Sequence, residues 1–164
     1  YLEHLRALVA ETRFMLQAPE DPLADPEEQR LQLDHIGRLS NSVAMVAVRP
    51  GRSPGRDPIL GSLTLLGGTL ARTRSGALLS MGVVASAWGL GIGGALLDVG
   101  MAWARQNPTL VRVGLQVYAD NAPARGLYRS RGFVEEGVLR RDVRELDGAE
   151  EDLVGMSAWV GRPR

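Results

Sequence analysis

The chain has 164 residues, of which 45% are hydrophobic and 23% are charged. This composition is ordinary for a folded protein, and the length is enough for one domain with its own core. The 19 basic and 19 acidic residues cancel, so the overall charge does not indicate binding to nucleic acid or to a membrane surface. Cysteine and lysine are both absent from the sequence, which excludes disulfides, thiolate nucleophiles and lysine Schiff bases.

Metal-binding and membrane-spanning patterns are also missing from the sequence. The only histidines are His4 and His35, and neither belongs to an H-E-x-x-H pattern, so we expect no metal site. The N-terminal stretch carries charged residues, and no uninterrupted apolar run reaches transmembrane length. We therefore expect one cytoplasmic domain over residues 1–164, without a signal peptide and without membrane or nucleic-acid partners.

Two helices are predicted near the start of the chain. Apolar residues at helical spacing predict a helix over 2–17, which ends before Pro19. Asp25 followed by Pro26 and two glutamates is typical of a helix start, because the aspartate caps free N–H groups and the acids favour the positive end of the helix dipole. This second helix closes at Ser40-Asn41.

Three strands are predicted next. The apolar run over 43–48 is typical of a buried strand, and the Pro-, Gly- and Arg-rich residues 49–58 predict a loop. Residues 59–70 predict a strand with a bulge or bend at Gly67-Gly68. A further strand over 77–84 leads into a glycine-rich segment.

The second half of the chain predicts helices and strands in alternation. A helix over about 93–106 precedes a strand over 110–118, in which apolar residues alternate with more polar ones. Asp120-Asn121 offers a cap for a short helix. Two strands, 133–146 and 151–160, surround an Asp-Gly pair that is typical of a hairpin. These elements predict a mixed α/β domain built around an open sheet.

The glycine-rich segment between a strand and a helix is the clearest functional signal. Gly89, Gly91, Gly93 and Gly94 fall within six positions, so a ligand can approach the backbone there. The first N–H groups of a helix have no partner and carry the positive end of the helix dipole, a combination that binds phosphate or pyrophosphate. A tight turn in which glycine only relieves strain is the alternative, and the number of glycines favours the anion site.

This segment also satisfies the G-x-G-x-x-G pattern of dinucleotide-binding folds. Those folds place the glycines after their first strand and an acidic residue about 20 residues later, which holds the ribose. Here the glycines lie beyond the middle of the chain, and positions 105–119 contain no acidic residue. A dinucleotide enzyme is therefore the less favoured interpretation.

A second motif lies about 30 residues downstream. Residues 121–133 fit N-x-x-A-x-x-L-Y-x-x-x-G-F, and they follow a valine, a short spacer and G-x-G-x-G at the start of a helix. The two motifs together resemble the GCN5-related N-acetyltransferase (GNAT) family. The resemblance extends from Glu11 to Trp159, and its nearest branch is that of ribosomal-protein N-terminal and small-amine acetyltransferases.

The resemblance implies an α/β fold with a mixed, mostly antiparallel central sheet flanked by helices, a splayed strand pair, and acetyl-CoA as the acyl donor. It also implies that backbone groups bind this cofactor at Met81, Val83, Val84, Gly89, Leu90, Gly91, Ile92, Gly93 and Gly94. The strand residues would pair with pantetheine and the loop with the pyrophosphate. Trp88 replaces the usual Arg or Gln, and we expect binding to be retained with one pyrophosphate donor lost.

Three residues of the second motif have expected roles. Tyr128 matches the family tyrosine that acts as general acid toward the CoA sulfur. Asn121 is either a polar residue near the cofactor or only a helix cap, and Arg125 either reaches a CoA phosphate or is an exposed helix arginine. No residue is identified as the base that takes the proton of the amine, although Glu135 and Glu136 lie nearby in sequence. An acceptor with an α-amine of low pKa would need less help, which favours a peptide N-terminus or a similar amine.

Several alternatives stay open. The acceptor is a peptide N-terminus or a small amine, and transfer to it is direct because no cysteine can carry the acetyl group. A catalytically degenerate module that binds CoA is the second functional hypothesis. A homodimer is expected from the family. The family's first strand normally precedes the first helix, whereas this sequence starts almost inside that helix, so the strand is either missing from it or unusually short.

Overall fold

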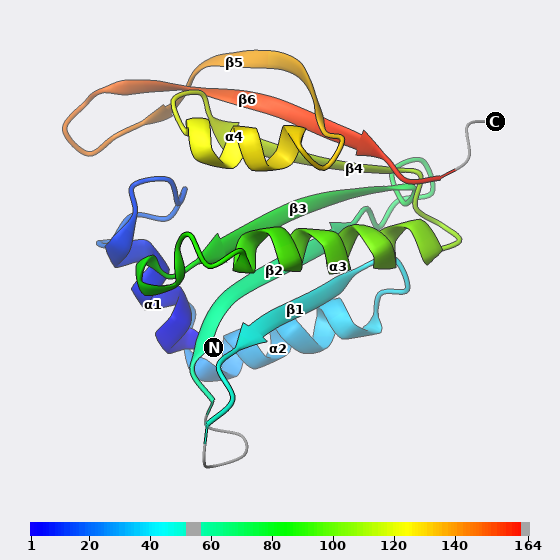
Figure 1. The fold of residues 1–164 in the computed structure, drawn as a ribbon, viewed down its shortest axis with the longest axis horizontal. Coiled ribbons are helices and arrows are strands. Elements are labelled where there is room, and N and C mark those ends of the chain that lie inside the picture. The colour runs from blue at the N-terminus through cyan, green and yellow to red at the C-terminus, as the bar shows by residue number, and fades with distance from the viewer. Residues whose placement is uncertain (52–56, 162–164) are drawn as a thin grey trace.

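The computed structural model describes residues 1–51 and 57–161, so the predicted loop over 49–58 lies partly outside the described residues. The elements are α1 (Leu2–Glu11), α2 (Pro26–Arg38), β1 (Val43–Val48), β2 (Ile59–Gly67), β3 (Gly76–Val83), the short 3-10 helix η1 (Ala85–Ala87), α3 (Ile92–Gln106), β4 (Arg112–Tyr118), α4 (Ala122–Arg129), β5 (Val134–Arg144) and β6 (Glu150–Trp159). Figure 1 shows their arrangement. Across the described residues, none of the helices has the length and apolar character needed to cross a membrane.

One six-stranded sheet organises the fold, with the strand order β1-β2-β3-β4-β6-β5. All neighbouring strands are antiparallel except β3 and β4, which confirms the predicted mixed, mostly antiparallel sheet. The parallel pair is matched only over Gly76–Leu78 and Arg112–Gly114. Beyond these residues β3 and β4 diverge, as Figure 1 shows, and they form the expected splayed pair.

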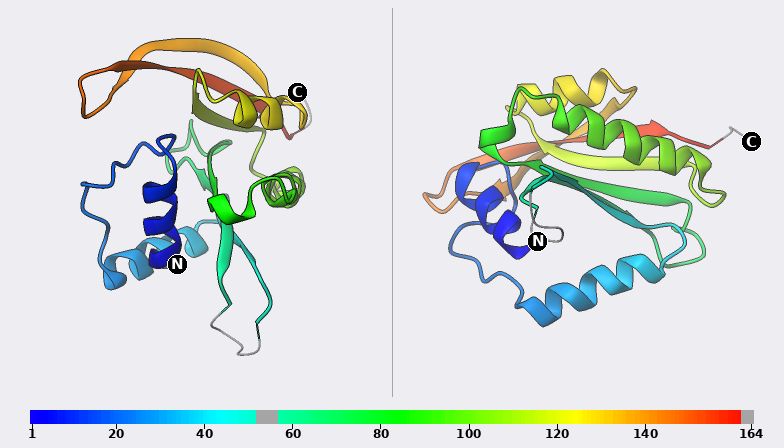
Figure 2. Two further views of the ribbon diagram at one scale, coloured as in Figure 1. Left: turned by 60° about the vertical axis from the view of Figure 1, so that its left-hand side comes forward. Right: turned by 60° about the horizontal axis from the view of Figure 1, so that its bottom comes forward.

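The helices cover opposite faces of the sheet. Consecutive strand residues point to opposite faces, and on β2 the Ser62 side chain contacts His4 of α1 whereas a Cβ at Gly61 would meet Leu96 of α3. Figure 2 shows α1 and α2 on one side of the sheet and α3 on the other. The main core lies between the sheet and α3, where the most deeply buried side chains include Leu63, Leu65, Leu97, Met101 and Val113.

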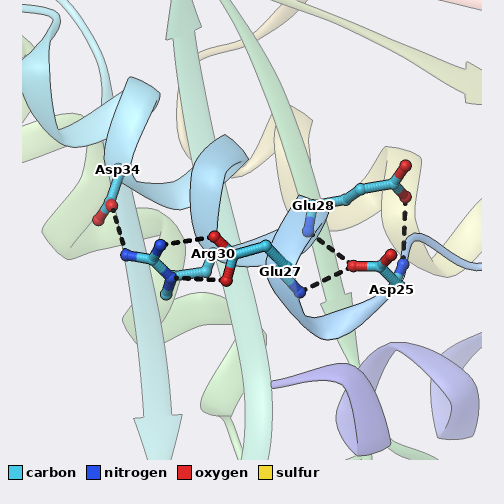
Figure 3. Close-up of polar contacts among 5 residues, drawn as sticks. All are labelled: Asp25, Glu27, Glu28, Arg30 and Asp34. Carbon is cyan, nitrogen blue, oxygen red and sulfur yellow. Dashed lines mark hydrogen bonds and ion pairs between the residues drawn. The ribbon is translucent and has the colours of Figure 1, made fainter.

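The start of α2 forms as the sequence predicts. The Asp25 carboxylate accepts hydrogen bonds from the N–H groups of Glu27 (2.8 Å) and Glu28 (2.9 Å), and the Glu28 carboxylate accepts one from the Asp25 N–H (Figure 3). This reciprocal pattern gives a partner to N–H groups at the start of the helix that would otherwise have none. Arg30 pairs with Glu27 one turn earlier and with Asp34 one turn later, which adds support along the exposed face.

Three predicted elements differ from the structure. The first helix ends at Glu11 and not at residue 17, because Thr12 is extended and its hydroxyl accepts a hydrogen bond from the Phe14 N–H. The strand over 43–48 is an edge strand with alternate residues exposed, and is not a buried one. The predicted bulge at Gly67-Gly68 is instead the end of β2, where the Gly68 N–H donates to the Gly76 carbonyl.

The buried His4 makes stability depend on pH. His4 is 5% exposed, with its Nε2 3.0 Å from the Ser62 hydroxyl, and burial is the main cause that lowers its pKa below the ordinary 6.5. In the unfolded chain this histidine takes up a proton at a higher pH than in the folded one. Its contribution to stability is therefore complete above pH 6.5 and is lost as the pH falls through the lower folded value.

We expect the free energy of unfolding to fall between pH 7.5 and pH 5.5, by at most about 1.4 kcal/mol per pH unit from this one group. Urea unfolding at the two pH values measures the loss. The His4→Gln variant cannot take up this proton, so its free energy of unfolding should fall less between pH 7.5 and pH 5.5. An equal loss in the variant and the wild type would show that His4 does not carry the effect.

Candidate donor site

The glycine loop ends in a cap that leaves helix N–H groups free. Gly89 and Gly91 have φ values of +73° and +78°, a conformation that side chains other than glycine rarely adopt. Gly91 is the N-cap residue of α3, and its carbonyl accepts from the Ala95 N–H. The N–H groups of the first helical residues, starting at Ile92, have no partner inside the helix. This geometry has the form of an anion cradle at the positive end of the helix dipole.

The first turn of α3 is packed against both β3 and α4. A Cβ at Gly93 would lie 3.4 Å from Leu127 of α4 and 3.6 Å from Val83 of β3. The structure therefore brings together the loop, the end of β3 and the helix that carries Tyr128. The sequence places these segments about 30 residues apart and does not by itself predict this contact.

Arg131 is a residue that the sequence analysis missed. A Cβ at Gly94 would lie only 2.6 Å from Nη2 of Arg131, so the guanidinium lies directly over the first turn of α3. Its Nε is 3.3 Å from the Asp98 carboxylate. Arg131 lies just beyond the end of α4, so no helical spacing in the sequence indicates that it reaches Gly94. The guanidinium adds a positive charge beside the free N–H groups.

The backbone of β3 determines which groups face the opening between β3 and β4. The Val84 N–H donates to the Leu60 carbonyl on the β2 side. Groups on a strand alternate in direction, so the N–H and C=O groups of Met81 and Val83 point away from β2 and toward the opening. The Val84 N–H, which the resemblance implies for pantetheine, instead donates to β2, so only Met81 and Val83 are kept in the proposed pairing below.

Trp88 does not point its donor at the glycine loop. Its indole Nε1 donates to the Val83 carbonyl at 2.7 Å, and the side chain is 55% exposed. From the sequence we expect only that a pyrophosphate donor is lost at this position. The structure adds that the indole N–H donates its hydrogen bond to a strand carbonyl.

Tyr128 lies at the buried end of α4, with 7% of its surface exposed. Its ring packs against Phe133 at a centroid distance of 5.7 Å. Burial raises the pKa of Tyr128 to about 12, because the charged phenolate is poorly solvated there. The hydroxyl is therefore protonated at neutral pH, as a proton donor must be.

Asn121 and Arg125 both have partners within the protein. The Asn121 side chain accepts from the Ala124 N–H at 3.1 Å, so it caps α4. The Arg125 guanidinium donates to the Ala119 carbonyl and to the Glu135 carboxylate. These contacts join α4 to the ends of β4 and β5, and the contact of Arg125 with a CoA phosphate stays a prediction.

Glu135 and Glu136 are poorly suited to act as bases. Hydrogen bonds from Arg125 and Arg129 lower the pKa of Glu135. Hydrogen bonds from Ser157 and Arg112 lower the pKa of Glu136. Both carboxylates are held by arginine and favour the charged state, so neither readily accepts a proton from an amine.

An aromatic and charged cluster lies where β4 ends, on the loop that follows α1. Phe14 stacks edge-on against Tyr118 at 5.6 Å, and Arg13 lies over both rings. Arg13 also forms ion pairs with Asp120 and Glu151. Burial, and then the nearby Glu145 carboxylate, raises the pKa of Tyr118. The cluster consists of Arg13, Phe14, Tyr118, Asp120, Glu145 and Glu151.

Comparison with known proteins identifies the family. Residues 9–133 match the family described as the Acetyltransferase (GNAT) family. The chain belongs to this family. It is an N-acetyltransferase with acetyl-CoA as acyl donor, which confirms the resemblance of the two motifs. The dinucleotide alternative is wrong, and the sheet agrees, because it has one parallel pair where a dinucleotide fold has a mostly parallel sheet.

Solved structures of the GNAT family share the fold. A GNAT-family acetyltransferase from Streptococcus pneumoniae is 25% identical, with a TM-score of 0.89 over 96% of this chain and 90% of that one. A ribosomal-protein-alanine N-acetyltransferase from Brucella melitensis is 26% identical, with a TM-score of 0.80 over 96% and 93%. The acetyltransferase yncA from Salmonella typhimurium, solved with its cofactor acetyl-CoA, is 19% identical, with a TM-score of 0.82 over 99% and 87%.

Proposed function

We propose that this acetyltransferase binds acetyl-CoA along the opening between β3 and β4 and transfers the acetyl group directly to the primary amine of a peptide N-terminus. One observation carries the proposal: β3 and β4 pair only as far as Leu78 and Gly114, so beyond Leu78 the backbone groups of β3 that face the opening have no ladder bonds to β4. An amide-rich pantetheine chain can pair with Met81 and Val83 as an added strand does. The pyrophosphate would then lie on the free N–H groups of α3.

The transfer forms one C–N bond and breaks one C–S bond. A neutral amine attacks the thioester carbonyl, the thiolate leaves, and the amine gives up a proton. Tyr128 would donate to the leaving sulfur through its hydroxyl, which is protonated at neutral pH. The sequence contains no cysteine that could carry the acetyl group between two steps, which supports direct attack.

The acceptor is inferred from the weakness of the available bases. Glu135 and Glu136 are held by arginines, so an acceptor that loses its proton easily has an advantage. A peptide α-amine, with a pKa near 8, is neutral far more often at pH 7 than an alkyl amine near 10. A structural relative is named as a ribosomal-protein-alanine N-acetyltransferase.

A thiol-release assay with a panel of acceptors tests the proposal. We expect release with short peptides that have a free α-amine, and much less with the same peptides blocked at the N-terminus but carrying a lysine. A preference for simple polyamines would contradict the peptide acceptor. Stabilisation by acetyl-CoA without thiol release from any amine would support the CoA-binding module instead. The homodimer and the cytoplasmic location expected from the sequence stay predictions.

The position of Arg131 predicts a contribution to donor binding. Arg131→Gln removes a positive charge that lies beside the first turn of α3, and we expect the Kd for acetyl-CoA to rise about 10- to 100-fold, as for the loss of one hydrogen bond to a charged group. Isothermal titration calorimetry measures this change. The Arg105→Gln variant, at the other end of α3, is the matched control and should bind normally. Equal affinities in the two variants would remove Arg131 from the site.

A further inference from the structure

The indole of Trp88 occupies a carbonyl that the proposed donor would use. In the peptide unit between Val83 and Val84, the N–H donates to Leu60 on the β2 side. No peptide bond in the described part of the chain is cis, so the carbonyl of the same unit points the opposite way, toward the opening between β3 and β4. There it accepts the Trp88 Nε1–H at 2.7 Å.

We propose that Trp88 competes with acetyl-CoA for the Val83 carbonyl. In the free protein the indole N–H donates to this carbonyl, and an amide of pantetheine displaces the indole when acetyl-CoA binds. The inference rests on the proposed donor site. A carbonyl at a strand edge that faces an opening is the group to which an added chain donates. The tryptophan is 55% exposed, so its ring can turn toward solvent without leaving a buried cavity.

The competition between the Trp88 indole and pantetheine weakens the binding of acetyl-CoA by a measurable amount. Acetyl-CoA gains one hydrogen bond at Val83 but must first break the indole contact, so part of its affinity is lost. The nucleotide half of the donor has no pantetheine amide, and its binding to the loop leaves the indole contact in place. Trp88 therefore reduces the affinity for the pantetheine half and leaves that for the nucleotide half unchanged.

The Trp88→Phe variant tests this directly, because it keeps an aromatic ring and removes the N–H. We expect acetyl-CoA to bind about three- to ten-fold more tightly than in the wild type, the range of one hydrogen bond. We expect the affinity for 3′-phosphoadenosine 5′-diphosphate to stay within two-fold. Trp159→Phe is the matched control, since Trp159 is also exposed but lies at the end of β6 and has no hydrogen bond from its indole among the described residues. It should bind both ligands as the wild type does.

Tryptophan fluorescence gives a second readout. Acetyl-CoA should change the emission of the wild type and of Trp159→Phe as the Trp88 indole moves into water, and should leave the emission of Trp88→Phe nearly unchanged. Weaker or equal binding of acetyl-CoA by Trp88→Phe, or a parallel change in nucleotide affinity, overturns the inference while the donor site stands. If the wild type does not bind acetyl-CoA at all, the donor site itself is wrong and the inference fails with it.

Discussion

Replacing Tyr128 with phenylalanine is expected to lower kcat about 100-fold, because a positioned proton donor typically contributes a factor of 100 or more. The KM for acetyl-CoA should stay within about three-fold, since the phenol has no role in the pyrophosphate or pantetheine contacts. Steady-state kinetics with a peptide acceptor measures both constants. The ring stays packed on Phe133, so the variant should fold normally, which a thermal unfolding curve checks.

The pH dependence separates a proton donor from a packing residue. The pKa of Tyr128 is raised to about 12, so its hydroxyl stays protonated in the wild type over the whole working range. A thiol has a reference pKa of about 8.5, and above this pH the thiolate is a stable product that needs no proton. The ratio of the wild-type kcat to the Tyr128→Phe kcat should therefore become smaller above pH 8.5. A kcat within two-fold of the wild type at pH 7 would remove Tyr128 from the acid role.

Replacing Gly91 with alanine should raise the Kd for acetyl-CoA at least 30-fold. Gly91 has a φ of +78°, and an alanine there either strains the backbone or shifts the loop, which turns the free N–H groups away from the pyrophosphate. Apart from its chain neighbours, no atom of the described residues lies within 4 Å of the missing Cβ, so crowding in the free protein is not the cause. Isothermal titration calorimetry measures the affinity.

The β5–β6 turn provides a matched control for this variant. Gly148 also has a positive φ, +89°, and open space around its missing Cβ. Both alanine variants should lose a similar stability of about 1 kcal/mol, the usual cost of a left-handed conformation. Only Gly91→Ala should lose affinity for acetyl-CoA. Equal affinities in the two variants would show that the conformation at Gly91 does not matter for binding.

Local patterns in the sequence predicted the elements that frame the site. The cap at Asp25, the glycines before α3 and the hairpin around Gly148 each depend on a few neighbouring residues, and each forms as expected. The splayed pair of strands was predicted only from the family resemblance, because no local sequence pattern indicates where two strands stop pairing. Thr12 shows the limit of periodicity, since its side chain offers the backbone an alternative to the helix.

Contacts between segments that are distant in the chain could not be predicted from the sequence. The position of Arg131 over Gly94 depends on how α4 packs against α3, and the Arg125–Glu135 pair depends on the register of β5. The direction of the Val84 N–H follows from strand pairing, which a single-strand pattern leaves undetermined. At these positions the structure shows contacts that the sequence alone did not predict.

A crystal structure of the complex with acetyl-CoA tests the central claim most directly. We predict that the pyrophosphate lies on the first turn of α3, that pantetheine pairs with Met81 and Val83 between the diverging strands, and that the sulfur lies within hydrogen-bonding distance of the Tyr128 hydroxyl. A donor bound elsewhere, or a sulfur out of reach of Tyr128, would contradict the account.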